Sequence, residues 1–151
     1  MKINIIDLFA GCGGLTDGFL QTKNFNTLAA VDWEYPTILT LKERLKKKWN
    51  YDSDLKNILH FDIQRTDELL NGFMDSKYGI SEGLIEIVGN NNVDLVVGGP
   101  PCQAYSIAGR VRDKNGMHDD YRNFLFESYV KLVDQFKPNS FVFENVEGIL
   151  S

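Results

Sequence analysis

The fold is decided by residues 3–15, which have the sequence INIIDLFAGCGGL. The apolar run Ile3–Phe9 is typical of a buried β-strand, and the pattern that follows, Leu15–Thr22, is typical of a helix. The glycines between them let the backbone turn tightly and approach a ligand, and a helix N-terminus offers free N–H groups. The turn alone does not establish a binding site, because a tight strand–helix connection also favours glycine.

The same alternation continues along the chain. Apolar runs bounded by turn residues predict further strands over Thr27–Asp32, Ile58–Phe61, Val93–Gly98 and Ser140–Glu144. Helical periodicity predicts helices over Tyr35–Trp49, over Arg122–Phe136 and, more weakly, over Thr66–Met74 or Ser81–Val88. Strands that alternate with helices form parallel βαβ units. We therefore expect an α/β fold with an open, doubly wound, mostly parallel sheet in a single domain, residues 1–151.

Composition narrows the class of protein. The chain is 43% hydrophobic and 25% charged, which is ordinary for a soluble globular protein. Its apolar runs are far shorter than the roughly 20 residues that span a bilayer, so we expect no membrane association and a cytoplasmic location. The two cysteines, Cys12 and Cys102, are expected to be free thiols in that setting. The isolated histidines His60 and His118 give no metal-ligand spacing, so we predict no metal site.

Polar and aromatic residues follow the second and third predicted strands. Asp32 ends the second strand and precedes Trp33, while Asp62 follows the third. A carboxylate at such a position can accept the hydroxyls of a ribose, and an indole beside it can cover an adenine ring. Each residue taken singly is also compatible with a solvated turn or a packing role. Together, at successive strand ends, they indicate a ligand that contains adenosine.

The fourth predicted strand ends in the sequence GGPPCQAYS, residues 98–106. Two prolines fix the backbone before Cys102 and present it at the carboxyl edge of the sheet, where open α/β sheets bind ligands. A buried structural cysteine is the alternative. Glu144 ends the fifth strand at the same edge, where Phe141 and Phe143 would partly shield it from water and suit it to proton donation. An exposed strand-end glutamate is the competing interpretation.

In this order, DLFAGCGGL, Asp32-Trp33, Asp62-Ile63, GGPPCQAYS and Glu144-Asn145-Val146 resemble the motifs of the cytosine-C5 DNA methyltransferases. The resemblance covers essentially the whole chain and implies the Rossmann-like fold of S-adenosylmethionine-dependent methyltransferases. It also implies a role in DNA methylation, as in restriction–modification systems. The residues that would border the cofactor are Phe9, Gly11, Gly13, Leu15, Asp32, Trp33, Asp62, Ile63, Pro100 and Leu125.

The resemblance also assigns roles in catalysis. Cys102 would add to C6 of a flipped-out cytosine, which makes C5 nucleophilic enough to take the methyl group and leaves S-adenosylhomocysteine. Glu144 would hold a proton at N3, and Asn145 would orient the Pro-Pro-Cys turn. Residues 103–121 would form a loop that closes over double-stranded DNA. The residues that would contact DNA are Gln103, Ser106, Arg110, Arg112 and Arg122. A solvated basic loop is the alternative interpretation.

The chain departs from the family in one respect. Family members continue with further strands and a target-recognition domain, and we expect this chain to be truncated after the fifth strand, without that domain. This would explain a net charge of −5 and a pI near 5.0, since DNA-binding domains are usually basic. A fifth strand with a free edge and an apolar sequence, Phe141–Phe143, would self-associate or bind a complementary C-terminal polypeptide. In a bacterium, the enzyme would associate with the nucleoid.

Three other functions are compatible with parts of the sequence. A branch of the same family methylates cytosine in tRNA. The target-recognition domain would decide between DNA and tRNA, and it is the part that we expect this chain to lack. The chain is also compatible with an inactive fragment that binds the cofactor or a complementary chain. A nicotinamide-dependent oxidoreductase shares the strand–glycine–helix start, but it leaves the Pro-Pro-Cys and Glu-Asn-Val turns unexplained.

Overall fold

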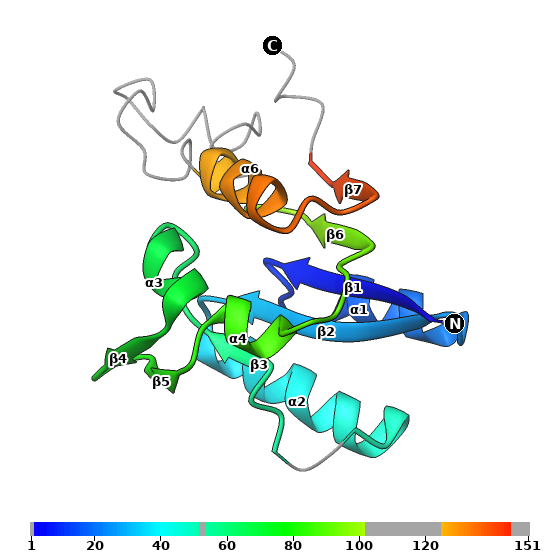
Figure 1. Ribbon diagram of the computed structural model, residues 1–151. Coiled ribbons are helices and arrows are strands. Elements are labelled where there is room, and N and C mark those ends of the chain that lie inside the picture. The colour runs from blue at the N-terminus through cyan, green and yellow to red at the C-terminus, as the bar shows by residue number, and fades with distance from the viewer. Residues whose placement is uncertain (1, 52–53, 102–124, 146–151) are drawn as a thin grey trace, which may run out of the picture.

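The computed structural model describes residues 2–51, 54–101 and 125–145. Its main sheet has five parallel strands in the order β3-β2-β1-β6-β7 (Figure 1). The strands are β1 (Ile3–Leu8), β2 (Phe25–Asp32), β3 (Ile58–His60), β6 (Leu95–Gly98) and β7 (Ser140–Phe143). The chain runs outward from β1 to β3 and then returns to the other side of β1. The strand order therefore reverses between β1 and β6, the kind of position at which open α/β sheets bind ligands.

Helices cover both faces of the sheet, as predicted for a doubly wound fold. Buried side chains of α1 and α2 pack on one face, and those of α3, α4 and α6 pack on the other. Figure 1 shows α6 and α2 on opposite sides of the strands. The helices are α1 (Gly14–Gln21), α2 (Tyr35–Trp49), α3 (Thr66–Asn71), α4 (Leu84–Val88) and α6 (Leu125–Phe136).

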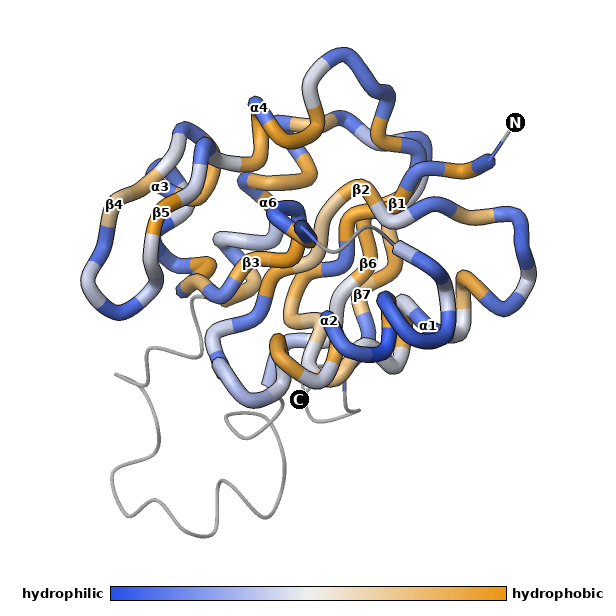
Figure 2. The backbone as a smooth tube through the Cα atoms, turned by 90° about the horizontal axis from the view of Figure 1, so that it is seen from below, coloured by the Kyte–Doolittle hydropathy of each residue, from blue (hydrophilic) through white to orange (hydrophobic). Residues whose placement is uncertain are grey.

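Strand β1 lies in the centre of the core. Ile6 and Leu8 point into the layer of α3, α4 and α6, whereas Ile5 packs with the α1 side chains, as the period of two along a strand requires. All three side chains are at most 1% exposed. The apolar residues accordingly gather in the central strands when the backbone is viewed from below (Figure 2).

The start and end of the helices follow from local sequence. Gly13 precedes α1 with a φ of 82°, a left-handed conformation that glycine adopts without strain. A Cβ at Gly13 would also collide with the side chain of Leu41 on α2. Helix α2 has Pro36 in its first turn and ends at Asn50, which has a φ of 53°. Gly13 and Pro36 thus mark where the two helices that follow β1 and β2 begin, and Asn50 marks where α2 ends.

The region between β3 and β6 differs from the prediction. The sequence favoured one weak helix, over Thr66–Met74 or Ser81–Val88, but α3 and α4 both form, and a hairpin of β4 (Phe73–Asp75) and β5 (Gly79–Ser81) lies between them. The Asp75 carboxylate accepts the backbone N–H groups of Lys77 and Tyr78 and so closes the hairpin turn. The predicted start of the last helix, residues 122–124, lies outside the described residues.

Candidate cofactor and catalytic site

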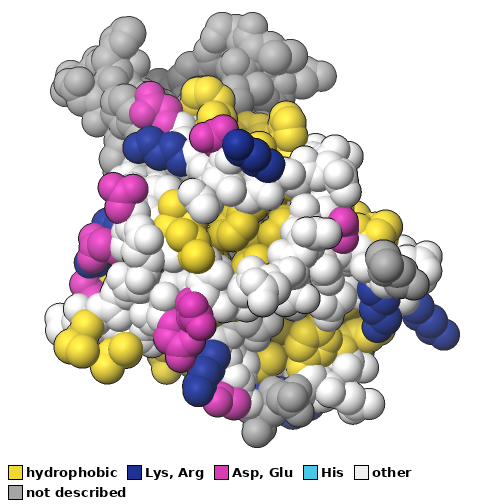
Figure 3. Space-filling view, viewed as in Figure 1, with side chains coloured by type: hydrophobic (Ala, Val, Ile, Leu, Met, Phe, Trp, Pro, Cys, Tyr) yellow, Lys and Arg dark blue, Asp and Glu magenta, His cyan; other side chains and the backbone are white. Residues whose placement is uncertain are grey.

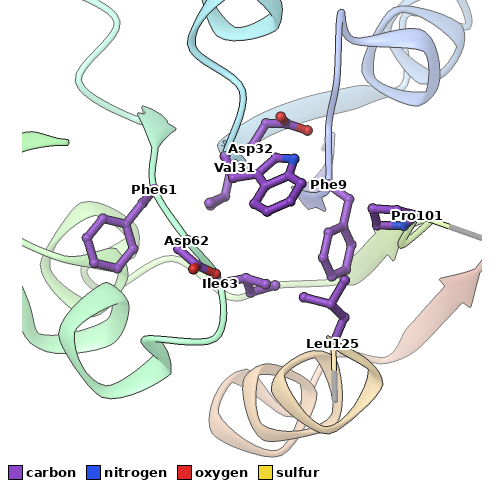
Figure 4. Close-up of a pocket in the computed structure, with 9 residues that line it drawn as sticks. Phe9, Val31, Asp32, Phe61, Asp62, Ile63, Pro101 and Leu125 are labelled. Carbon is purple, nitrogen blue, oxygen red and sulfur yellow. The ribbon is translucent and has the colours of Figure 1, made fainter. Parts of the chain in front are cut away.

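A narrow cleft opens at the carboxyl ends of β1, β2 and β3, and α6 closes it from the other side (Figure 4). The empty space within the cleft and its open mouth is about 320 Å³. The side chains of Phe9, Ile63 and Leu125 converge on it. The lining residues are Phe9, Val31, Asp32, Trp33, Phe61, Asp62, Ile63, Pro101 and Leu125.

Most of the residues predicted to border the cofactor lie in this cleft. Those that line it are Phe9, Asp32, Trp33, Asp62, Ile63 and Leu125. Gly11, Gly13, Leu15 and Pro100 do not line it. Leu15 packs with Phe19 and Phe25 on the α1 face, Pro100 is buried, and Pro101 lines the cleft in its place. Nothing in the sequence distinguishes the two prolines, because only the direction of the turn decides which ring faces the cleft.

Asp32 connects the turns that follow β1 and β2. One carboxylate oxygen, Oδ2, accepts the backbone N–H of Gly11 at 2.8 Å. The other, Oδ1, accepts the N–H of Glu34 at 2.8 Å and the hydroxyl of Thr37 at 3.1 Å. A carboxylate has about four lone-pair positions, so these bonds leave room for about one more donor. Asp32 therefore keeps acceptor capacity that faces the cleft, which it also lines.

Asp7 holds the start of α1 by accepting two hydrogen bonds from Thr16, a role that was not predicted from the sequence. Its Oδ2 accepts the backbone N–H of Thr16 at 3.1 Å and the Thr16 hydroxyl at 2.5 Å. The residue is fully buried, and Oδ1 has no partner among the described residues. Burial raises the pKa of Asp7 to about 6, and the nearby carboxylate of Asp32 raises it further. The two hydrogen bonds from Thr16 lower the pKa, but by less than burial raises it. The available signal was an acid next to the apolar pair Ile5 and Ile6 within the predicted strand.

Asp62 enters the cleft from the end of β3. Its Oδ1 accepts the N–H of Gln64 at 3.0 Å, which turns the chain so that Ile63 lies beside it. The preceding residue, Phe61, stacks on Phe73 with ring centroids 3.9 Å apart. This packing holds the strand end against the hairpin, so the carboxylate and the Ile63 side chain form one wall of the cleft.

The second half of the site begins where β6 and β7 end. Glu144 donates its backbone N–H to the carbonyl oxygen of Gly98 at 2.9 Å, which extends the pairing of the two strands. A Cβ built on Gly99 would lie 2.6 Å from Glu144 Oε2. The glycine therefore lets the glutamate side chain lie directly over the turn that leads, through Pro100 and Pro101, to Cys102.

The expected shielding of Glu144 is not found in the described part of the chain. Glu144 is exposed, and Phe141 is itself 59% exposed on the outer side of β7. The reason is that β7 is the outermost strand among the described residues, and residues 140–142 are exposed there. Five residues of the predicted DNA-contacting set and the predicted nucleophile lie outside the described residues: Cys102, Gln103, Ser106, Arg110, Arg112 and Arg122. Asn145 is partly buried directly after Glu144.

Two further features concern the described residues, 2–51, 54–101 and 125–145. None of the helices there is long and apolar enough to cross a membrane. No three His, Cys, Asp or Glu side chains there are placed to hold a metal ion. Cys12, in the glycine-rich turn, is an exposed free cysteine, as expected from the sequence.

A parallel sheet that reverses its order beside a cleft is a Rossmann-like arrangement, and a solved methyltransferase structure has the same fold. A putative DNA modification methyltransferase encoded within an Escherichia coli prophage superimposes with a TM-score of 0.67 at 26% identity, over 99% of this chain and 34% of that one. The family model described as C-5 cytosine-specific DNA methylase matches residues 3–74 and 75–151. The chain belongs to this family, and the resemblance inferred from its motifs is confirmed.

Sequence relatives include bacterial type II methyltransferases. M.Bpa9945I of Bacillus paralicheniformis is 36% identical over 97% of this chain and 41% of its own length. M.AgeI of Thalassovita gelatinovora is 37% identical over 97% of this chain and 28% of its own length. The chain thus spans less than half the length of these relatives.

Proposed function

We propose that this chain is the cofactor-binding and catalytic part of a DNA cytosine-5 methyltransferase that uses S-adenosylmethionine. The observation that carries the proposal is the shared edge of the sheet. The cleft with Asp32, Trp33 and Asp62 adjoins the turn in which Gly99 lies against Glu144 and from which the chain leads to Cys102. A methyl donor in the cleft would therefore lie beside the nucleophile.

The cleft fits an adenosine group by its chemistry. Phe9, Ile63 and Leu125 offer apolar walls for a flat ring, and the Asp62 carboxylate can accept a hydrogen bond from its amino group. Asp32 keeps about one free acceptor position for a ribose hydroxyl. When bound, S-adenosylmethionine would supply an electrophilic methyl group, and the product would be S-adenosylhomocysteine.

The catalytic steps are assigned to residues at the ends of β6 and β7. The Cys102 thiolate adds to C6 of a cytosine, and Glu144 holds a proton at N3 as charge develops there. Asn145 orients the Pro-Pro-Cys turn. After methyl transfer, a base removes the C5 proton and the thiolate leaves. The target base must leave the stack, because C6 is inaccessible inside a duplex.

The proposed partner is double-stranded DNA, in the cytoplasm. Gln103 and Ser106 follow Cys102 closely and would contact the DNA around the flipped base. The cations Arg110, Arg112 and Arg122 would contact phosphates. The relatives named type II methyltransferases support this substrate.

A covalent trap tests the assignment. A duplex in which 5-fluorocytosine replaces cytosine is incubated with S-adenosylmethionine and the chain, alone and reconstituted with a complementary polypeptide. Fluorine cannot leave as a proton does, so the Cys102 adduct persists and is seen as a band resistant to denaturation. The Cys102→Ser protein forms no adduct, while Cys12→Ser, at the exposed cysteine, forms it normally. Absence of the adduct in every preparation, or its survival in Cys102→Ser, would refute the catalytic assignment.

We also propose that the outer edge of β7 pairs with another polypeptide strand, from a complementary chain or a second copy. Among the described residues, β7 pairs only with β6. Phe141 and Val142 are 59% and 43% exposed, and Phe126 and Val130 of α6 are 50% and 48% exposed. Hydrophobic side chains gather over α6 and β7 in the space-filling view (Figure 3). Exposed apolar side chains beside an unpaired strand edge favour association.

A further inference from the structure

His60 contacts the turn that carries two cleft residues. It is the last residue of β3 and pairs with Asp32 of β2 in the parallel ladder. Its ring Nε2 lies 2.9 Å from the backbone carbonyl oxygen of Trp33. A carbonyl oxygen only accepts hydrogen bonds, so Nε2 must carry the proton in this contact.

Aromatic neighbours hold the His60 ring in this orientation. The ring centroid lies 5.2 Å from that of Tyr35, the first residue of α2, and 4.8 Å from that of Tyr78, in the hairpin turn. Both rings are tilted to the imidazole by about 60°. Contacts with α2 and with the β4–β5 hairpin therefore fix the direction in which the Nε2–H group of His60 points.

The backbone around Trp33 shows what this donor does. Strand β2 ends at Asp32, whose carbonyl oxygen accepts the N–H of Phe61 at 2.9 Å. The carbonyl of Glu34 accepts the N–H of Ile38 at 3.2 Å, in the first turn of α2. Trp33 lies between the last residue of β2 and the first turn of α2, and its carbonyl oxygen accepts a hydrogen bond from the His60 side chain.

We propose that His60 is a positioning residue for the cofactor cleft, which it serves by donating Nε2–H to the Trp33 carbonyl. The bond fixes the two-residue connection between β2 and α2, and with it the directions in which the Trp33 indole and the Asp32 carboxylate leave the backbone. The inference rests on the proposed function, because it concerns the same cleft. His60 itself does not line the cleft.

Two variants separate the donor from the ring. His60→Phe keeps a ring between Tyr35 and Tyr78 but has no donor. His60→Gln loses the ring and keeps an N–H group that can reach the carbonyl. A neutral hydrogen bond contributes a net 0.5–1.5 kcal/mol, so we expect His60→Phe to bind S-adenosylhomocysteine about two- to tenfold more weakly in isothermal titration calorimetry. His60→Gln should stay within about twofold of the original chain, because the donor is restored.

A second measurement needs no cofactor. The chain has two tryptophans, so labelling with 5-fluorotryptophan gives two ¹⁹F NMR signals, which Trp49→Phe assigns. In His60→Phe the Trp33 signal should shift or broaden while the Trp49 signal stays in place. A third measurement uses the original sequence: ¹⁵N-histidine spectra, assigned with His118→Gln, should show Nε2 of His60 protonated.

Each outcome decides the proposal. An unchanged Trp33 signal in His60→Phe, equally weak binding in His60→Phe and His60→Gln, or an unprotonated Nε2 of His60 would overturn it. If the original chain binds no S-adenosylhomocysteine, the proposed function fails, while the ¹⁹F and ¹⁵N spectra still show whether His60 fixes the Trp33 turn. If His60→Phe does not fold, the ¹⁵N spectrum and the His60→Gln titration decide.

Discussion

Asp7 makes the stability of the chain depend on pH. Its pKa rises from an ordinary value of 3.8 to about 6 on folding, chiefly because the carboxylate is buried. The folded protein therefore binds the Asp7 proton more tightly than the unfolded chain does. The stabilisation from this proton is fully present below about pH 3.8 and is lost as the pH rises through 6. The rise corresponds to about 3 kcal/mol, of which about half is lost between about pH 5 and 7.5.

Asp7→Asn removes this titration. Its amide oxygen can still accept the N–H and hydroxyl of Thr16, whereas its buried NH₂ group adds a cost that does not depend on pH. We therefore expect the difference in free energy of unfolding between the variant and the original chain to move in favour of the variant between pH 5 and 7.5, by about half of those 3 kcal/mol. Urea titrations at half-unit pH steps measure it.

An exposed carboxylate supplies the matched control. Glu86 lies exposed on α4, and Glu86→Gln should give a stability profile parallel to that of the original chain over this range. A constant difference between Asp7→Asn and the original chain at every pH would refute the argument, because it would mean that Asp7 ionises equally easily in the folded and unfolded states.

Three further predictions concern the site and the sheet edge. Gly99→Ala places a Cβ 2.6 Å from Glu144 Oε2, so the glutamate side chain must move away. We expect kcat to fall about tenfold or more because Glu144 is displaced. The melting temperature should change little, since the displaced atom ends a flexible side chain. Asp32→Asn puts an NH₂ group against the donors of Gly11 or of Glu34 and Thr37, so calorimetry should show S-adenosylhomocysteine bound about tenfold more weakly, with lower stability. Phe141→Lys charges the exposed edge of β7 and should reduce the sedimentation coefficient of any associated species, whereas Lys131→Ala on α6 should not; equal association in both would contradict an interface at this edge.

The strands of the main sheet could be predicted because each is a short, mainly apolar run bounded by turn residues. Strand β1 ends one residue before the predicted end, at Leu8, since Phe9 adopts a φ of 60° and begins the turn. The hairpin β4–β5 could not be predicted, because three-residue strands carry no period and the Asp75 turn that closes them is a matter of side-chain hydrogen bonds.

The lining of the cleft was predicted where a residue ends a strand, as Asp32 does. A lining residue was missed where packing in three dimensions decides which side chain faces the cleft. Pro101 faces it, while the neighbouring Pro100 is buried. His60 was considered only as a metal ligand, because the sequence places it 27 residues from Trp33 and only the pairing of β2 with β3 brings them together. Asp7 was overlooked within an apolar run, although a carboxylate in such a run is costly to bury and indicates a specific partner.

The bond between Asp32 and Gly11 has a consequence for how tightly a ligand binds. Two loops that follow different strands share one acceptor, so they are ordered together before any ligand arrives. The entropy of arranging them is then lost during folding rather than during binding, and less of the interaction energy is spent on ordering. The aspartate at the end of β2 thus makes the cleft preorganised, because the Gly11 turn is held in place by the folded chain itself.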